Sequence, residues 1–202
     1  MLIANEEYPG LEPRTYLDQI EQLGHTLRTR LGAESVAERQ IAAMNTLLFG
    51  EEGFRGNAGN YYDPRNSYLN EVIDRRLGIP ITLSLVYLEV GKRAALPLSG
   101  VGFPAHFLIA YEAEPRLFID PFTCGRLLSL DDLQQLLFQA FGNSARLEPK
   151  HLSPSTPRQM LERMVTNLQV AYERAGDYAR ARRASEQLAL VHLSGGLRER
   201  RN

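Results

Sequence analysis

Residues 80–93 read PITLSLVYLEVGKR, and this stretch decides the fold. Proline is well accommodated in the first turn of a helix, so Pro80 marks a helix start. The stretch is nearly apolar on every side, with Thr82, Ser84 and Glu89 as the polar positions before its basic end. A helix that is apolar all round is typical of the centre of a domain. The sequence therefore predicts a buried central helix.

Shorter amphipathic elements precede this helix. Apolar residues recur at three- and four-residue spacing, the helical period, and the glycines that follow them are typical helix stops. The expected elements are helices over 17–31, 35–50 and 66–78 and an irregular loop over 53–66. A capping box at Ser35-Val36-Ala37-Glu38 is expected to begin the second helix, and Asn66 or Ser67 to cap the third.

Short runs rich in β-branched and aromatic residues follow the central helix. They cover 98–103, 107–111 and 116–119, separated by turn residues, and predict three antiparallel strands. Ser129 then begins a helix that Gly142 ends. Helices in the first half and a small antiparallel sheet in the second indicate an α+β fold.

The last quarter of the chain is predicted to be a pair of helices. Residues 150–156 contain Ser153-Pro154-Ser155 and have the composition of a linker. Beyond them, 157–172 and 178–192 have helical periodicity, and alanines at 179, 181 and 184 permit close packing. We therefore expect a domain over 1–150, a linker over 151–156 and helices over 157–202. One helix pair leaves an apolar end exposed, so it should pack on the main domain or mediate homodimerisation.

Composition excludes several classes of protein. The chain has 202 residues, of which 44% are hydrophobic and 23% charged, with a net charge of −1 and one cysteine. That cysteine, Cys124, has no intrachain disulfide partner, so a reducing cytoplasm is expected. The start of the chain lacks a signal-peptide pattern, and no apolar run is long enough to span a membrane.

The region 157–202 carries nine arginines against five acidic residues. Such a basic region can contact nucleic acid or an acidic partner, but a solvated helical face in an arginine-rich chain is the favoured explanation. The region has no aromatic stacking platform or nucleic-acid reading motif, so nucleic-acid binding is not expected.

Two residues point to nucleophilic chemistry. His106 opens one predicted strand, and Asp120 ends the next in the run Ile119-Asp120-Pro121. Adjacent antiparallel strands can bring the two side chains within hydrogen-bond reach. An aspartate behind a histidine fixes the imidazole tautomer, which supplies two members of a nucleophilic triad.

The same residues carry a resemblance to a known family. Residues 61–70, YYDPRNSYLN, residues 78–84, GIPITLS, and the segments His106-Phe107-Leu108 and Asp120-Pro121-Phe122 resemble the SirB-type bacterial branch of the transglutaminase-like superfamily. The resemblance covers residues 1–150 and implies a papain-like α+β domain. Residues 167–181 resemble one tetratricopeptide-like repeat, which in this branch follows the domain.

The resemblance also implies a cysteine nucleophile at the start of the central helix in active members. Here that place is Pro80, Ile81 or Thr82, and none of these is a cysteine. Our interpretation is a pseudoenzyme that acts through a protein or peptide partner. The alternative is a hydrolase or acyltransferase that uses the Thr82 hydroxyl, or Cys124, with His106 and Asp120.

Each of these candidates also has a purely structural interpretation. The hydroxyls of Thr82 and Ser84 can bond backbone carbonyls or cap the first helical turn, and Cys124 can be a small buried hydrophobe. A satisfied His106–Asp120 pair can also simply join two strands.

A second candidate site lies in the loop before the third helix. Tyr61, Tyr62, Asp63, Arg65 and Asn66 can line a cleft that binds a peptide or small ligand. Alternatively, the acidic and amide side chains order the turn.

The remaining histidines are His25, His151 and His192, and they are scattered along the sequence. No pair has metal-ligand spacing, so we expect neither a metal nor another cofactor.

Overall fold

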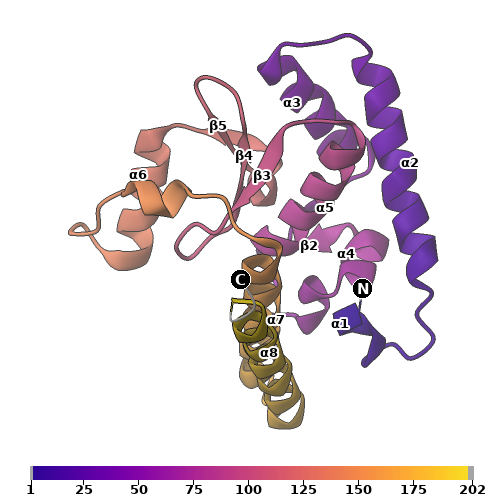
Figure 1. Cartoon of the computed structure of the whole chain (residues 1–202), viewed down its shortest axis with the longest axis vertical. Helices are drawn as coiled ribbons and strands as arrows, with labels where there is room; N and C mark the ends of the chain where they lie inside the picture. Colours follow the sequence, from indigo (N-terminus) through magenta and orange to yellow (C-terminus); the bar gives the residue numbers. More distant parts are fainter. Residues whose placement is uncertain (1, 200–202) are drawn as a thin grey trace.

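Helix α5 (Pro80–Arg93) occupies the centre of the protein, with N-terminal helices on one side and a sheet on the other (Figure 1). The structure is a computed structural model and describes residues 2–199. Nine residues of α5 are buried, including both Thr82 and Ser84, which are 0% exposed. The prediction of a buried central helix is therefore confirmed.

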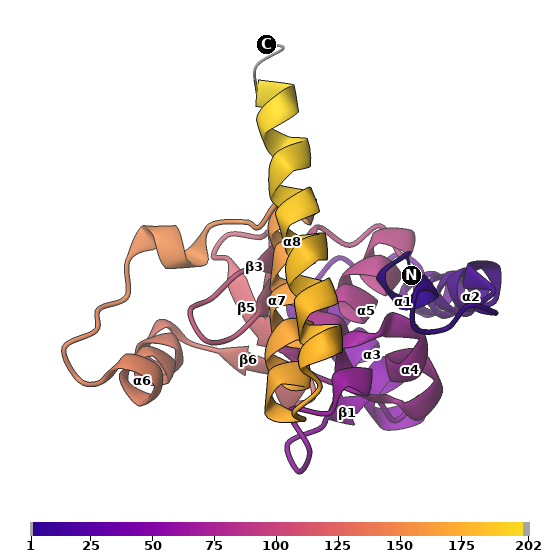
Figure 2. The ribbon, with the colours of Figure 1, turned by 90° about the horizontal axis from the view of Figure 1, so that it is seen from below.

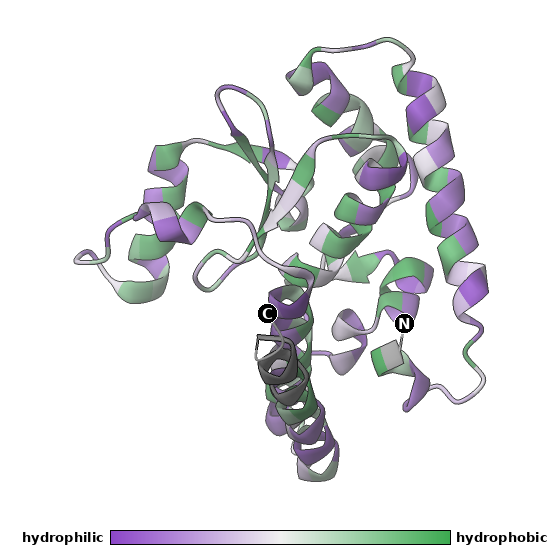
Figure 3. Ribbon diagram, viewed as in Figure 1, coloured by the Kyte–Doolittle hydropathy of each residue, from purple (hydrophilic) through white to green (hydrophobic). Residues whose placement is uncertain are grey.

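The N-terminal half packs helices against α5. It contains α1 (Leu2–Asn5), α2 (Pro13–Leu31), α3 (Ala37–Asn45), the π-helical turn η1 (Thr46–Glu51), the 3-10 turn η2 (Pro64–Ser67) and α4 (Leu69–Arg75). Figure 3 shows hydrophobic and hydrophilic residues mixed along α2, as in an amphipathic helix. Its Ile20, Leu23 and Leu27 are buried in the same cluster as Val86 and Val90 of α5.

A four-stranded antiparallel sheet covers the other side of α5. Its order is β3 (Leu98–Val101), β4 (Leu108–Tyr111), β5 (Leu117–Asp120) and β6 (Arg126–Leu128). Alternate residues face opposite sides, so Ile109 joins the cluster with α5, whereas Leu108 packs with Leu133 of α6 (Leu130–Phe141). The α+β class is confirmed, and the three expected strands are present.

The C-terminal helices α7 (Pro157–Arg174) and α8 (Tyr178–Glu199) form an antiparallel pair that extends away from the sheet (Figures 1 and 2). The pair is packed on the main domain, as expected. Met164 shares a buried cluster with Phe107, and Leu168 shares one with Tyr68. The hydroxyls of Tyr68 and Tyr172 are 2.9 Å apart and hydrogen-bonded.

The segment predicted as a linker also contacts the domain. It includes the second half of the 3-10 turn η4 (Pro149–Leu152), and Pro154 forms a β-bridge with Val101. Ser155 N–H donates to the carbonyl of Gly100. These contacts fasten residues 154 and 155 to the edge strand β3.

Several local expectations are wrong. Ser35 does not cap α3; instead, Glu34 Oε1 accepts the N–H groups of Ser35 and Val36, at 3.0 and 2.9 Å. Two-residue strands β1 (Arg55–Gly56) and β2 (Leu77–Gly78) pair in parallel, and neither they nor β6 were expected. Strands this short offer no periodicity to read.

In the part of the chain that the structure describes, no helix has the length and hydropathy of a membrane span.

Candidate functional site

His106 and Asp120 form the hydrogen-bonded pair that the sequence predicts. His106 lies in the bend just before β4 rather than within a strand, and Asp120 is the last residue of β5. The distance from His106 Nε2 to Asp120 Oδ1 is 2.9 Å, and both side chains are largely buried. The antiparallel pairing of β4 with β5 brings them together across 14 residues of sequence.

Asp120 also holds the turn that follows it. Its carboxylate accepts the N–H of Phe122 at 3.0 Å and the hydroxyl of Thr123 at 2.9 Å, capping the 3-10 turn η3 (Pro121–Thr123). An aspartate at this position satisfies backbone donors that otherwise lack a partner. The carboxylate therefore has three donors, of which the imidazole is one.

An aromatic wall stands beside the pair. The ring of Phe122 packs edge-on against the His106 imidazole, with centroids 6.2 Å apart, and Tyr61 packs on Phe122 from the other side at 5.9 Å. A Cβ on Gly56 would lie 2.6 Å from Phe122, so a glycine is required where β1 approaches η3. Phe122 belongs to the Asp120-Pro121-Phe122 motif of the sequence, but the pattern did not indicate its contact with Gly56.

The second ring nitrogen of His106 is not hydrogen-bonded to a nucleophile among the described residues. Nδ1 of His106 has no hydrogen-bond partner among the described residues. The backbone carbonyl of His106 accepts a hydrogen bond from Arg163 of α7 at 3.2 Å, which ties the bend to the C-terminal helices.

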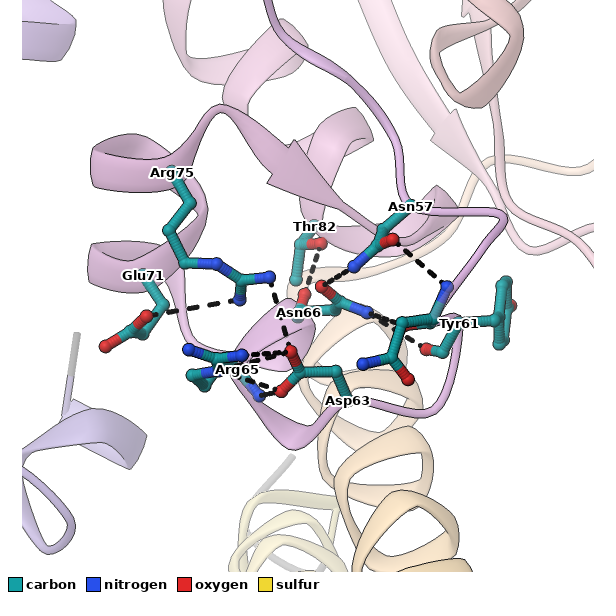
Figure 4. Close-up of polar contacts among 9 residues, drawn as sticks. Asn57, Tyr61, Asp63, Arg65, Asn66, Glu71, Arg75 and Thr82 are labelled. Carbon is teal, nitrogen blue, oxygen red and sulfur yellow. Dashed lines mark hydrogen bonds and ion pairs between the residues drawn. The ribbon is translucent and has the colours of Figure 1, made fainter.

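Thr82, the candidate hydroxyl nucleophile, is bonded elsewhere. Its Oγ1 donates to the carbonyl of Asn66 at 2.8 Å and accepts the N–H of Ile79 at 3.1 Å. The hydroxyl thus caps the first turn of α5 and holds the preceding loop (Figure 4). Thr82 thus makes the backbone hydrogen bonds of the structural interpretation, and His106 is not among its hydrogen-bond partners.

Cys124, the other candidate nucleophile, follows η3. It is an exposed free cysteine in the left-handed conformation, with φ 56°. The expectation of a small buried hydrophobe is therefore wrong, because the residue ends the turn at the surface.

The second candidate cluster centres on a buried carboxylate. Asp63 is 8% exposed, caps η2 by accepting the N–H of Arg65, and pairs with the guanidinium groups of Arg65 at 2.8 Å and Arg75 at 3.3 Å (Figure 4). Burial alone would raise the pKa of Asp63, but the hydrogen bonds and charges of these arginines hold it below its ordinary value of 3.8. The carboxylate is committed to these internal partners.

Asn66 organises the rest of this loop. It is fully buried; its Nδ2 donates to the carbonyls of Asn60 and Tyr61, and its Oδ1 accepts from Asn57 at 3.0 Å. Instead of capping α4, as the sequence suggested, the side chain joins the two ends of the loop (Figure 4).

The exposed part of the cluster is formed by Tyr62 and Arg65. Tyr62 is 41% exposed, and the guanidinium of Arg174 from α7 lies 3.9 Å from the centroid of its ring. Residue 174 is 112 positions away in sequence, so no local pattern could identify it. The structure thus brings Tyr62, Asp63, Arg65 and Asn66 to one loop, with Tyr62 and Arg65 facing solvent.

The described residues contain no group of three or more histidine, cysteine or acidic side chains arranged to hold a metal ion.

Comparisons with known proteins agree with this architecture. A family model described as "Transglutaminase-like superfamily" matches residues 14–166. The "UPF0162 protein" of Xylella fastidiosa is 36% identical over 192 residues, covering 93% of this chain and 68% of the relative, and that of Vibrio cholerae is 30% identical over 190 residues, covering 91% and 70%.

Similarity extends to a eukaryotic protein. Human "F-box only protein 21" is 32% identical over 145 residues, which is 67% of this chain but 22% of that protein. No solved structure matches this chain significantly.

Proposed function

We propose that this chain, which belongs to the transglutaminase-like superfamily, is a non-catalytic member that acts by binding a protein or peptide partner. We place it in the SirB-type bacterial branch, in the cytoplasm, with α7 and α8 as a tetratricopeptide-like unit. This finer placement rests on the motifs in residues 61–84 and on the helix–turn–helix pattern of residues 167–181.

The observation that carries this proposal is the surroundings of His106. Nucleophilic catalysis requires a thiol or hydroxyl within about 3 Å of its base. At the start of α5 the available hydroxyl, that of Thr82, is bonded to the backbone of Asn66 and Ile79. Asp120 meanwhile caps its own turn. The pair therefore has a structural role that explains its presence without catalysis.

The exposed side of the loop supplies a candidate binding surface. Tyr62 and Arg174 meet there, and Arg174 belongs to α7, so the domain and the helix pair contribute jointly. Arg65 is exposed on the same loop. Tyrosine and arginine are enriched among the residues that dominate binding energy at interfaces. A guanidinium on an aromatic ring, with a second arginine on the same loop, suits an acidic or carboxylate-bearing segment of a partner.

Activity assays test the non-catalytic part. We expect no amidase, protease or amine-transfer activity that distinguishes the natural chain from His106→Ala, and no covalent labelling by an acylating probe. Activity that disappears in His106→Ala would refute the proposal. Probe labelling lost in Thr82→Val or in Cys124→Ser would instead support the hydrolase or acyltransferase alternative and identify its nucleophile.

Crosslinking in the native bacterium tests the binding part. Arg65→Ala should lose the crosslinked partner, because the Arg65 side chain is 56% exposed at the surface described above. Arg14→Ala is the matched control, since it removes the same charge from an 84% exposed side chain on α2. Equal capture by both variants would show that this surface is not the partner site.

A further inference from the structure

Helix α7 carries two arginines whose charges are not compensated by a carboxylate. Its three arginines are Arg158, Arg163 and Arg174. Arg158 pairs with Glu162 at 2.9 Å, whereas neither Arg163 nor Arg174 forms an ion pair with a carboxylate among the described residues. Their contacts there are a backbone carbonyl and an aromatic ring, which carry no net charge. Both guanidinium groups therefore remain available to an anionic partner.

The two arginines lie on one side of α7. The 11 residues from 163 to 174 span about three turns, so the two side chains leave the helix in nearly the same direction. At the helical rise, their Cα atoms are about 16 Å apart. Asn167 and Val170 lie between them on this side and are half-buried. We call Arg163, Asn167, Val170 and Arg174 the arginine face.

Two tyrosines border the arginine face. The rings of Tyr61 and Tyr62 pack edge to face, with centroids 5.2 Å apart. Arg174 lies over the ring of Tyr62 at 3.9 Å. Burial raises the pKa of Tyr61 and the charge of Arg163 opposes this rise, as expected for a guanidinium near the phenol. The tyrosine loop therefore follows α7 from one arginine to the other.

Arg163 also borders open space. It lines a recess of about 450 Å³ between α7, α8 and the residues around Phe107. Among the described residues that line this recess only Glu162 is acidic, and it lies 2.9 Å from Arg158 and 3.4 Å from His192. The guanidinium of Arg163 is therefore the uncompensated charge of the recess, which suits a carboxylate.

Given the partner-binding role proposed above, we propose that the arginine face binds an extended acidic segment of a partner protein, with one carboxylate at Arg163 and a second at Arg174. A separation of about 16 Å corresponds to about five residues of extended chain. Alternate side chains of such a chain point to opposite sides, so the two matching acidic residues are four or six positions apart. Arg163 thus joins Arg174 as a residue that determines which segment binds.

A polypeptide fits this surface better than a single-stranded nucleic acid does. Proteins that bind single strands stack the bases on aromatic rings. Here each ring already packs on another group, because Arg174 covers Tyr62 and Tyr61 packs against both Phe122 and Tyr62. The surface therefore offers positive charge without a stacking platform.

A two-dimensional 1H–15N NMR titration of the full chain tests the proposal. In about 0.15 M salt, charges more than about 8 Å away are largely screened, so binding reports local contacts. The probes are three capped glycine-serine peptides with two glutamates four apart, six apart or adjacent, and oligothymidylate. We expect saturable shifts at Tyr61, Tyr62 and α7. The better spaced peptide should bind about threefold tighter than the adjacent one, the gain from one partly exposed ion pair.

Arginine variants assign this gain to the arginine face. Arg163→Gln and Arg174→Gln should each weaken binding of the better spaced peptide about threefold and remove its advantage over the adjacent one. Arg182→Gln is the matched control, since it removes the same charge from an 82% exposed side chain on α8 and should change nothing. Arg174→Gln, checked by circular dichroism, keeps the test valid if Arg163→Gln does not fold.

The alternative outcomes separate this proposal from the partner surface itself. Equal affinity for spaced and adjacent glutamates, or an Arg163→Gln variant that behaves like Arg182→Gln, overturns the two-point site, whereas the partner surface is tested separately by crosslinking with Arg65→Ala. Tighter binding of oligothymidylate than of every peptide overturns the site in favour of a nucleic acid. A lack of saturable shifts with all three peptides also overturns it.

Discussion

Replacing Asp120 with alanine tests whether the pair with His106 supports the fold. The carboxylate accepts three hydrogen bonds, from His106, Phe122 and Thr123, at 2.9, 3.0 and 2.9 Å. The residue is 4% exposed, so solvent cannot replace these bonds fully. Its removal leaves the backbone N–H of Phe122 without its acceptor.

The expected cost is about 3 kcal/mol of unfolding free energy. Hydrogen bonds to charged groups contribute roughly 1.5–3 kcal/mol each, but three bonds to one side chain are not additive. For a chain of this size, that loss lowers the melting temperature by about 6–12 °C. Asp120→Asn keeps an acceptor for Phe122 and should cost about 1 kcal/mol.

Urea unfolding followed by circular dichroism measures these values. Asp18→Ala on the exposed face of α2 is the control, with an expected change within about 0.5 kcal/mol. Combining Asp120→Ala with His106→Ala gives the coupling between the two residues, which should exceed about 0.5 kcal/mol. Groups retained for catalysis are commonly neutral or costly to stability. An Asp120→Ala variant as stable as the natural protein would therefore refute the structural role.

Three further perturbations test the surrounding packing. Gly56→Ala places a Cβ 2.6 Å from a backbone oxygen of η3 and should lower the unfolding free energy in urea by about 1–3 kcal/mol. Gly50→Ala is the control, because its Cβ would have nothing within 4 Å. Equal effects of the two substitutions would contradict the contact. Tyr68→Phe removes the hydrogen bond to Tyr172, so it should lower the unfolding free energy by about 1 kcal/mol and speed amide hydrogen exchange in α7. Unchanged exchange would count against this hydrogen bond as an anchor of α7. Because the pKa of Asp63 is lowered in the folded state, its ionised form adds stability above about pH 4, and this stability is lost as pH falls through the folded pKa. The difference in unfolding free energy between the natural protein and Asp63→Asn should therefore shrink in acid. A difference that stays constant down to about pH 3 would disprove this.

The central helix and the paired strands were predictable because their signals are long or regular. The stretch 80–93 is apolar except at Thr82, Ser84, Glu89 and its basic end, and each of the strands β3 to β5 lies in a run rich in β-branched and aromatic residues bounded by turn residues. Once these strands pair antiparallel, His106 and Asp120 must lie near each other, and their hydrogen bond follows. The superfamily was recognisable for a related reason, since three of its four motif segments, 78–84, 106–108 and 120–122, lie on or beside these elements.

The remaining features depend on contacts that no local pattern encodes. Arg174 reaches Tyr62 only because α7 packs beside the loop. The predicted cap at Ser35 failed because the carboxylate of Glu34, one residue earlier, satisfies the same backbone donors. Equivalent capping solutions in neighbouring residues differ by a fraction of the energy of one hydrogen bond, and tertiary packing decides between them.

The loop and the start of α5 together explain how a fold of this family is held without a nucleophile at the helix start. The Thr82 hydroxyl donates a hydrogen bond to the carbonyl of Asn66, and the Asn66 side chain in turn holds both ends of the loop. A side chain at position 82 that faced His106 would leave that carbonyl unpaired in a fully buried place, at a cost of about 1–3 kcal/mol. One of the three positions where the resemblance implies a thiol is therefore part of the anchor of the loop that carries Tyr62 and Arg65. The side chain at residue 82 cannot both hold that loop and present a reactive group to His106. This conflict favours binding as the role of this domain.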